Sequence, residues 1–268
     1  MERISDETYV LVYRDERRKW IVRPKDTPKL HTHLGILDCE SLVGREFGFK
    51  AKTTMGDELL ILRPTIEEMI MKFSRRTQVI YPKDMGLIAL KLGIHSGSSV
   101  VETGTGSGAT TALLAYLVMP SGHVYTYDVR EDFQEVARKN LEKLGLADYV
   151  TFRTADARVG FEETGIDAGV LDVGDPWEVL GSMKRSLKPS APIAAVTPTT
   201  NQAEKLVQRM KEEGFVSIET VEILMRRLEA RVGMTRPSGT MVGHTAYLTF
   251  GRTTREIEGG DEKRTDNS

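Results

Sequence analysis

The first quarter of the chain alternates short apolar runs with glycines and charged residues. Residues 9–13 and 59–62 are two such runs, built from Val, Ile, Leu and Tyr. Runs of this kind between turn residues are typical of strands, so we predict a small β-rich domain over residues 1–63. Residues 64–71 have helical spacing after an initial proline, which a helix accepts in its first turn. Residues 64–81 are therefore interpreted as a linker helix and loop.

A different pattern, strand alternating with helix, occupies residues 82–254. Strands are expected at residues 98–103, 123–128, 149–153, 168–171 and 193–196, and helices at residues 82–92, 110–117, 131–144 and 201–213. Such alternation indicates a mostly parallel sheet with helices on both faces. Residues 217–224 and 245–250 read as strands without a helix between them, which predicts an antiparallel last strand. Residues 255–268 are charged and aperiodic, and we expect this tail to be disordered.

The strongest local signal is Gly104-Thr105-Gly106-Ser107-Gly108, between a predicted strand and a predicted helix. Glycine lets the chain turn sharply and lets a ligand approach the main chain, where N–H groups of the helix face it. Asp128 ends the next strand, where a carboxylate can accept hydrogen bonds from ribose hydroxyls. A tight turn alone would explain the glycines, but the strand, the helix and the downstream acid together favour a nucleoside cofactor.

Two cofactors are compatible with this loop. Residues 104–109 also match the dinucleotide pattern G-x-G-x-x-G/A, so an NAD enzyme is the second interpretation. Glu102, Asp128 and Asp156 stand at the ends of successive predicted strands, and Asp156 is placed to bind the amino group of an adenine. Three acids suit S-adenosylmethionine (SAM), whose sulfonium and amino groups are cationic, and are unfavourable beside a pyrophosphate. We therefore predict SAM.

A second candidate loop, residues 172–177, follows the buried strand at residues 168–171. Ligands of doubly wound sheets bind at the carboxyl ends of central strands, so Asp172 could direct a carboxylate into the site. Trp177 would offer an aromatic face. The alternative interpretation, equally supported by this loop alone, is a turn with Asp172 as a helix cap and Trp177 in the core.

Several segments together resemble the TrmI family of tRNA (adenine-N1)-methyltransferases, which act in the T-loop. The segments are Arg75-Arg76-Thr77-Gln78-Val79-Ile80-Tyr81-Pro82-Lys83-Asp84, Glu102 to Gly108, Asp172 to Trp177, Arg236-Pro237 and Gly243-His244-Thr245. The resemblance covers nearly the whole chain except the tail. It implies an α/β, Rossmann-like class I methyltransferase domain behind the small N-terminal β domain, with SAM as methyl donor, tRNA as substrate and a homotetramer as assembly. Gly174 departs from the family, which usually has a proline there.

The resemblance also implies roles for individual residues. Catalytic roles fall to Asp172 and Tyr81. Cofactor contacts are expected from Gln78, Glu102, Gly104, Thr105, Gly106, Ser107, Gly108, Asp128, Asp156 and Asp172. Substrate contacts are expected from Arg75, Arg76, Trp177 and His244. Tyr81 or Trp177 would stack on an adenine turned out of the T-loop, although Tyr81 could equally be a hydroxyl-bonded core residue.

The net charge limits how RNA could be bound. The 37 Lys and Arg residues against 39 Asp and Glu give a formal charge of −2, which excludes a basic surface over the whole chain. Basic residues nevertheless cluster at residues 14–29 and 226–236. Acids are interleaved with them (Asp15, Glu16, Asp26 and Glu229), so a solvated face is the default interpretation of any single basic residue. In a tetramer, patches from neighbouring subunits would contact one tRNA together, and we expect its affinity to fall steeply with salt.

The remaining composition points to a cytoplasmic protein. No apolar run approaches the ~20 residues of a membrane helix, residues 1–10 lack an apolar signal core, and Cys39 is the single cysteine. His31 and His33 have no acid or cysteine cluster to support a metal, and none is expected. Two alternatives stay open: another class I methyltransferase, such as a protein isoaspartyl methyltransferase, and a non-catalytic RNA-binding partner subunit.

Overall fold

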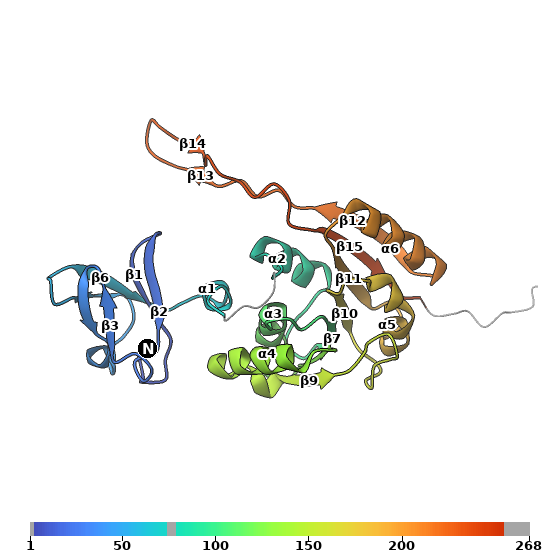
Figure 1. Cartoon of the computed structure of the whole chain (residues 1–268), viewed down its shortest axis with the longest axis horizontal. Coiled ribbons are helices and arrows are strands. Elements are labelled where there is room, and N and C mark those ends of the chain that lie inside the picture. Colours follow the sequence, from blue (N-terminus) through green and yellow to red (C-terminus); the bar gives the residue numbers. More distant parts are fainter. Residues whose placement is uncertain (1–2, 74–78, 255–268) are drawn as a thin grey trace, which may run out of the picture. The chain divides into compact units, whose positions relative to one another are not determined.

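The chain divides into two compact units, Met1–Phe73 and Ser74–Ser268. The computed structural model describes residues 3–73 and 79–254 (Figure 1). The expectation of a disordered tail at residues 255–268 lies outside the described residues. Within the described ranges, no helix combines the length and the apolar character that crossing a membrane would require.

The first unit is a small β structure. Its strands are β1 (Val10–Asp15), β2 (Arg18–Val22), β3 (Lys29–Thr32), β4 (Gly35–Asp38), β5 (Phe49–Lys52) and β6 (Glu58–Leu62), with a short 3-10 helix at Glu40–Leu42. Four strands form an antiparallel sheet in the order β2-β1-β6-β5, and β3 pairs with β4. Alternate residues of β1 and β6, among them Val10, Val12, Leu59 and Ile61, are buried in one core with Cys39. Burial alternates with period 2 along β6, whereas Leu11 of β1 is buried as well.

A short helix, α1 (Ile66–Ile70), ends this unit. Its first turn is closed by a capping box: the Thr65 hydroxyl accepts from the Glu68 N–H, and the Glu68 carboxylate accepts from the Thr65 N–H. This reciprocal cap satisfies two helix donors that would otherwise lack partners.

The second unit is built on a seven-stranded sheet in the order β12-β15-β11-β10-β7-β8-β9. Its strands are β7 (Ser99–Thr103), β8 (His123–Asp128), β9 (Val150–Thr154), β10 (Ala168–Leu171), β11 (Pro192–Thr197), β12 (Val216–Glu222) and β15 (Tyr247–Arg252). Strands β7 to β11 pair in parallel, and β15 is antiparallel to both of its neighbours. This arrangement confirms the predicted mostly parallel sheet with an antiparallel last strand.

Helices cover both faces of the sheet. They are α2 (Pro82–Lys91), α3 (Ala109–Val118), α4 (Glu131–Leu144), α5 (Leu180–Ser186) and α6 (Thr200–Glu212), with 3-10 turns at Ala147–Tyr149 and Pro176–Glu178. Figure 1 shows α2, α3 and α4 on one face and α5 and α6 on the other. The sequence did not predict α5, which has only 7 residues and includes glycine and two serines.

The connection between β12 and β15, residues 223–246, is called the arm below. It contains the short antiparallel pair β13 (Leu228–Glu229) and β14 (Arg236–Pro237). Figure 1 shows it as a long projection from the ends of β12 and β15. Leu228, Val232 and Met234 are exposed to 63%, 106% and 66%, so the arm presents apolar side chains that the sheet does not cover.

Candidate active site

The glycine loop between β7 and α3 touches the end of β10 through bare main chain. Gly104 has φ +94°, and a Cβ on it would lie 1.9 Å from the Asp172 carbonyl oxygen. Gly108, the N-cap of α3, has φ +80°, and a Cβ there would lie 2.8 Å from Leu141 Cδ1 of α4. Both positions therefore exclude a side chain for two reasons, backbone conformation and space. The loop is held against β10 on one side and against α4 on the other.

Glu102 lies beneath this loop rather than on an open surface. Its side chain is buried, and Oε2 accepts hydrogen bonds from the hydroxyls of Thr111 (2.5 Å) and Thr126 (2.7 Å). The Thr126 hydroxyl also bonds the Thr105 hydroxyl (2.7 Å). Burial raises the pKa of Glu102 to about 7, and Oε1 has no hydrogen-bond partner among the described residues. An unpartnered buried carboxylate oxygen favours a cation nearby.

Asp128 and Asp156 end β8 and follow β9, respectively. Asp128 Oδ2 accepts from the Gly106 N–H (3.2 Å), and Oδ1 accepts from the Arg130 N–H (3.0 Å). The Asp156 carboxylate receives hydrogen bonds from the Arg158 guanidinium, at 2.6 Å from Nη2, and this contact lowers the pKa of Asp156. An adenine amino group bound at Asp156 would have to share the carboxylate with Arg158.

Asp172 directly follows β10. Its main-chain N–H donates to the Thr103 carbonyl (2.8 Å), which continues the sheet pairing with β7 for one more residue. Among the described residues, none donates a hydrogen bond to its carboxylate. Burial raises the pKa of Asp172 to about 6, so the carboxylate form predominates at pH 7. The site thus holds an anionic acceptor whose hydrogen-bonding capacity is unused.

These residues surround one cavity. Gly104, Gly106, Asp128, Asp156 and Asp172 all line a hollow of about 480 Å³, a size typical of small-molecule sites. Its walls combine bare main chain with four aspartates, since Asp175 also lines it, and with Arg130 and Arg158. A fifth acid, Glu102, lies buried under the loop. This composition fits SAM, which is cationic and carries no phosphate, better than a dinucleotide.

The remaining residues of the predicted loop contact the protein interior. The side chains of Thr105 and Ser107 are buried, and the Ser107 carbonyl accepts a hydrogen bond from Asn140 Nδ2 of α4 (3.0 Å). They stabilise the loop from below, while Gly104 and Gly106 form its cavity surface. Ligand contacts from Thr105 and Ser107 are therefore restricted to their main-chain atoms.

Trp177 does not lie where the sequence analysis put it. The side chain is 7% exposed and belongs to the core around Leu180 and Met183, and Lys205 Nζ lies 4.1 Å from the centre of its ring. It is not among the residues that line the cavity. This placement contradicts the expectation that Trp177 stacks on a substrate base. It agrees with the alternative interpretation, a core tryptophan.

Tyr81 and His244 lie outside the cavity lining but at the same edge of the sheet. Tyr81 is the N-cap of α2 and is 38% exposed, so it is not a buried core tyrosine. His244 stands at the end of the arm, beside Glu222 of β12. Arg75, Arg76 and Gln78 lie outside the described residues.

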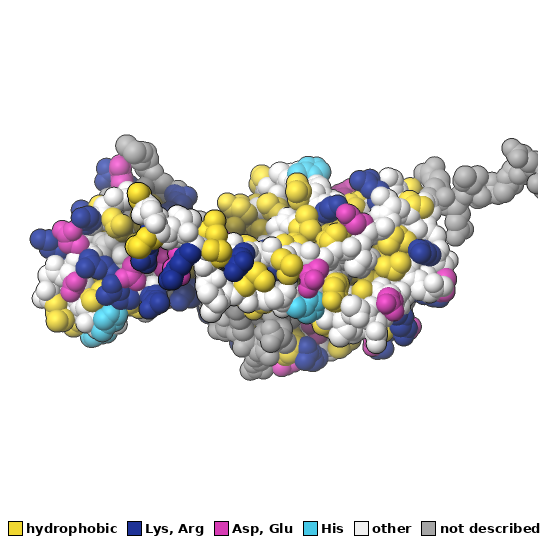
Figure 2. All heavy atoms as spheres, turned by 90° about the horizontal axis from the view of Figure 1, so that it is seen from above, with side chains coloured by type: hydrophobic (Ala, Val, Ile, Leu, Met, Phe, Trp, Pro, Cys, Tyr) yellow, Lys and Arg dark blue, Asp and Glu magenta, His cyan; other side chains and the backbone are white. Residues whose placement is uncertain are grey.

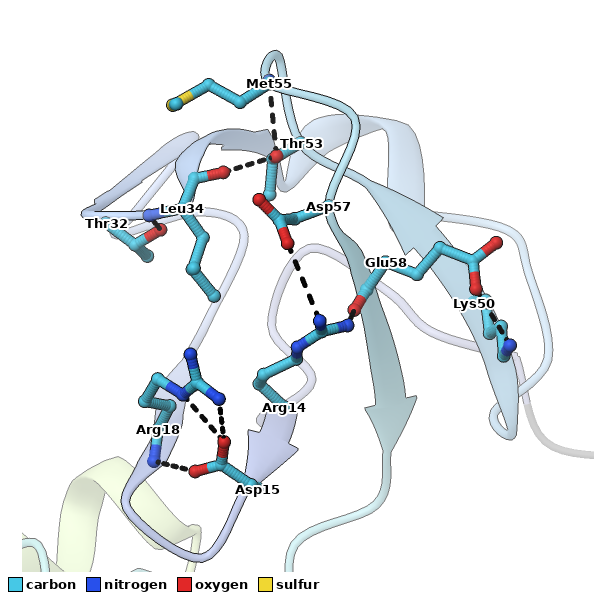
Figure 3. A network of polar contacts seen from close by, with 10 residues as sticks. All are labelled: Arg14, Asp15, Arg18, Thr32, Leu34, Lys50, Thr53, Met55, Asp57 and Glu58. Carbon is cyan, nitrogen blue, oxygen red and sulfur yellow. Dashed lines mark hydrogen bonds and ion pairs between the residues drawn. The ribbon is translucent and has the colours of Figure 1, made fainter.

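The basic cluster at residues 14–29 is largely neutralised. Figure 2 shows Lys and Arg over the first unit interspersed with Asp and Glu. Arg14 pairs with Asp57 and Arg18 with Asp15 (Figure 3). Further pairs join Lys19 to Glu16, Arg23 to Asp26 and Lys25 to Glu7. These pairs agree with the solvated face that the interleaved acids predict, and contact of this cluster with tRNA stays a prediction.

Sequence reasoning missed part of the cavity wall. Val129 and Arg130 line it next to Asp128, and Arg158 lines it next to Asp156. Their positions in the sequence could have indicated them, because each lies one or two residues after Asp128 or Asp156, the acids already predicted at strand ends. Arg130 also lies over the Phe133 ring, 3.3 Å from its centre, which keeps the guanidinium at the cavity rim.

Comparison with known proteins identifies the family. Residues 59–233 match the family model described as the tRNA methyltransferase complex GCD14 subunit. The chain is 34% identical over 276 residues to the tRNA (adenine(57)-N(1)/adenine(58)-N(1))-methyltransferase TrmI of Methanocaldococcus jannaschii, covering 93% of this chain and 97% of the relative. It is 32% identical to a tRNA (adenine(58)-N(1))-methyltransferase TrmI of Thermus thermophilus, covering 89% and 94%.

Two solved structures have nearly the same fold. One, described as a SAM-dependent O-methyltransferase from Thermotoga maritima, has a TM-score of 0.88 at 37% identity and covers 95% of this chain and 96% of its own. The other, the tRNA (m1A58) methyltransferase TrmI of Aquifex aeolicus, has a TM-score of 0.82 at 36% identity, covering 95% and 100%. With the glycine loop, the cavity and the full-length similarity together, the chain belongs to the TrmI family of SAM-dependent tRNA methyltransferases.

Proposed function

We propose that this protein transfers the methyl group of SAM to N1 of adenine 58 in the T-loop of tRNA, with adenine 57 as a second target. The observation that carries the proposal is Asp172: an unpartnered carboxylate on the wall of the SAM cavity, fixed through its own main chain against the glycine loop. Membership of the family provides the substrate class.

The chemistry requires little proton transfer. N1 of adenine already carries a lone pair, so no base has to deprotonate it before it attacks the methyl group, which SAM supplies on a sulfonium. The methylated ring becomes cationic. Asp172 would accept a hydrogen bond from the exocyclic amino group and stabilise this positive charge. Orientation of the ring beside the cavity would supply much of the remaining rate.

The base has to leave the folded T-loop to reach this cavity. Enzymes that act on a paired or stacked base turn it out and hold it against an aromatic side chain. Tyr81 is the candidate for this contact because it is exposed at the start of α2. Trp177 is not proposed, since its ring is buried.

The test is to treat tRNA with purified protein and SAM and to map the methylated nucleoside by mass spectrometry. N1-methyladenosine at position 58 is expected, and a tRNA with guanine at position 58 should lose that product. Methylation of a ribose hydroxyl would instead favour an O-methyltransferase, the description given to one similar structure. Methylation of an isoaspartyl peptide, or failure to bind SAM in calorimetry, would favour the other methyltransferase or the partner-subunit alternative.

We also propose a homotetramer that acts in the cytoplasm on tRNA. Support comes from the family resemblance and from the arm, whose exposed Leu228, Val232 and Met234 are side chains that a second copy could cover. Light scattering after gel filtration should give four times 30.0 kDa. Replacing Leu228 and Met234 by Asp should reduce that mass, and a monomeric wild type would contradict the assembly.

A further inference from the structure

Lys83, Asp84 and Thr245 form a closed hydrogen-bonded triangle outside the cofactor cavity. Lys83 Nζ donates to Asp84 Oδ1 (2.7 Å) and to Thr245 Oγ1 (2.6 Å), and the Thr245 hydroxyl donates to Asp84 Oδ2 (2.8 Å). The side chains of Lys83 and Asp84 are only 7% and 1% exposed. Burying an ion pair is costly and is tolerated when further hydrogen bonds satisfy its polar atoms. None of the three residues lines the cavity, so SAM binding does not explain the triangle.

The triangle joins two segments that are 161 residues apart. Asp84 lies in the first turn of α2, and its main-chain N–H donates to the Tyr81 carbonyl (2.9 Å). Thr245 is the second-last residue of the arm, just before β15. Because the hydroxyl of Thr245 bonds to both charged groups, the start of α2 and the base of the arm are fixed to each other.

His244, the neighbour of Thr245, anchors the same part of the arm in two further directions. Its Nδ1 lies 2.6 Å from Glu222 Oε1 at the end of β12, and its Nε2 lies 2.8 Å from the Pro198 carbonyl after β11. Both partners are acceptors, so the ring makes both bonds only when both nitrogens carry protons. The Glu222 carboxylate accordingly raises the pKa of His244.

All of these contacts lie at the edge of the sheet that carries Asp172. Strand β15 is antiparallel to β11, and Thr197 at the end of β11 pairs with Tyr247 at the start of β15. The base of the arm is therefore at the carboxyl ends of the parallel strands. Strand β11 neighbours β10, which Asp172 follows. The triangle thus connects Tyr81 and His244 on the β11 side of the edge, while SAM-binding residues occupy the β7 to β9 side.

We propose that Lys83, Asp84 and Thr245 are positioning residues for the target adenine. Their triangle holds the start of α2, which presents Tyr81, and the base of the arm, which presents His244, at fixed places beside Asp172. The inference rests on the proposed function, since it concerns how the RNA base is placed. It predicts that loss of the triangle lowers kcat/KM for tRNA and leaves the Kd for SAM unchanged.

The test uses Thr245→Val, which removes one hydroxyl and keeps the shape of the side chain and both charges. The steady-state value of kcat/KM for tRNA should fall about tenfold or more, since a small displacement of a reacting group is expensive. The Kd for SAM, from calorimetry, should stay within about twofold of wild type, because no cavity-lining residue changes. Thr245→Ser, which restores the hydroxyl, should recover most of the lost activity.

Thr220→Val is the matched control. It removes a hydroxyl that bonds Thr249 (3.0 Å) between β12 and β15, the two strands that the arm connects. This bond lies away from the triangle. If it lowers kcat/KM for tRNA as much as Thr245→Val does, the loss reflects general weakening of the edge strands and the proposal is overturned. A Thr245→Val protein whose SAM affinity falls in parallel with its activity overturns it as well.

A double mutant shows through which residue the triangle acts. If the triangle acts through Tyr81, adding Thr245→Val in a Tyr81→Ala background should cost much less than it does in wild type; if it acts through His244, the same should hold in a His244→Ala background. Full additivity in both backgrounds would contradict the proposal. If wild type binds SAM but leaves tRNA unmethylated, the proposed function fails. Normal tRNA methylation by Thr245→Val beside an active wild type instead rejects the triangle's role alone.

Discussion

The two halves of the sheet's carboxyl edge are built in different ways. On the β7 to β9 side, Glu102 accepts hydrogen bonds from Thr111 and Thr126, which lie 9 and 24 residues away in sequence. On the β11 to β15 side, Lys83 and Thr245 bond over 162 residues. We assign cofactor binding to the first half, which is a local unit, and placement of the substrate base to the second, which exists only when distant segments have come together. Cofactor binding and placement of the substrate base can therefore be disturbed separately.

Gly104 does not fit this separation, because it follows β7 on the cofactor side and packs directly against the main chain of Asp172, which follows β10. Gly104→Ala would place a Cβ 1.9 Å from the Asp172 carbonyl oxygen, and main-chain atoms cannot yield as a flexible side chain would. We expect the largest effect of any variant here: loss of detectable SAM binding in calorimetry, with loss of turnover. Gly86→Ala, in α2, is the control, since a Cβ there meets nothing within 4 Å and the residue does not line the cavity. SAM affinity equal to wild type in both variants would refute the contact.

Asp172→Ala should reduce turnover without weakening the binding of SAM. It removes the carboxylate that we propose faces the base, and it leaves the main-chain contact with Gly104 in place. We expect kcat to fall roughly 10²- to 10³-fold, the usual cost of losing one preorganised electrostatic contact, with the Kd for SAM nearly unchanged. Single-turnover methylation measures the first quantity and calorimetry the second. Near-normal turnover would remove Asp172 from its role.

The pH profile gives a second test of Asp172. Its pKa is raised to about 6, so the reactive carboxylate form is present above that pH and is lost as the pH falls through it. The value of kcat/KM should therefore decline on the acid side near pH 6. Asp172→Asn should abolish this acid limb along with most of the rate. If the limb persists in the Asp172→Asn variant, another group, such as Glu102, is titrating.

Glu102→Gln should have a smaller effect, on stability. Burial raises the pKa of Glu102 from 4.5 to about 7, so the folded state holds this proton more tightly than the unfolded state does. The free energy of unfolding should then fall by about 3 kcal/mol as the pH rises from 4.5 through 7. Urea titrations should show the variant more stable than wild type at pH 8, with the difference vanishing towards pH 4.5.

Asp156→Asn is the control for the sign of that effect. Its pKa is lowered by Arg158, so its stabilising contribution is present above the unfolded pKa and is lost as the pH falls. The two variants should change the pH dependence of unfolding in opposite directions. If both move it the same way, the burial of Glu102 is not the cause.

The local sequence pattern was sufficient to predict the elements on the β7 to β9 side of the sheet edge. The bounds of β8 and α4 agree with the prediction because strand period, helix period and the turn at Arg130 all lie within 22 consecutive residues. The glycines, Asp128 and Asp172 were identified for the same reason: strand ends are visible in the sequence, and parallel strands bring their carboxyl ends together.

The side-chain contacts on the β11 to β15 side could not be predicted from the spacing of residues in the sequence. Nothing near Thr245 in the sequence indicates that its hydroxyl meets Asp84, and nothing near Trp177 indicates that α6 covers its ring with Lys205. The ion pair between Arg14 and Asp57 likewise depends on how strands pair, whereas the pair between Arg18 and Asp15 is local in sequence. Side-chain partners set by tertiary packing are thus the part that a single sequence could not predict.

The contact between Gly104 and Asp172 has a consequence for opening of the protein. Since the carbonyl of one residue occupies the space where the other would carry a side chain, neither loop can shift without carrying its neighbour along. Hydrogen exchange at the start of α3 and at the residues after β10 should accordingly proceed through one shared opening event. The cavity wall formed by the glycine loop and the carboxylate of Asp172 would then be lost together or not at all.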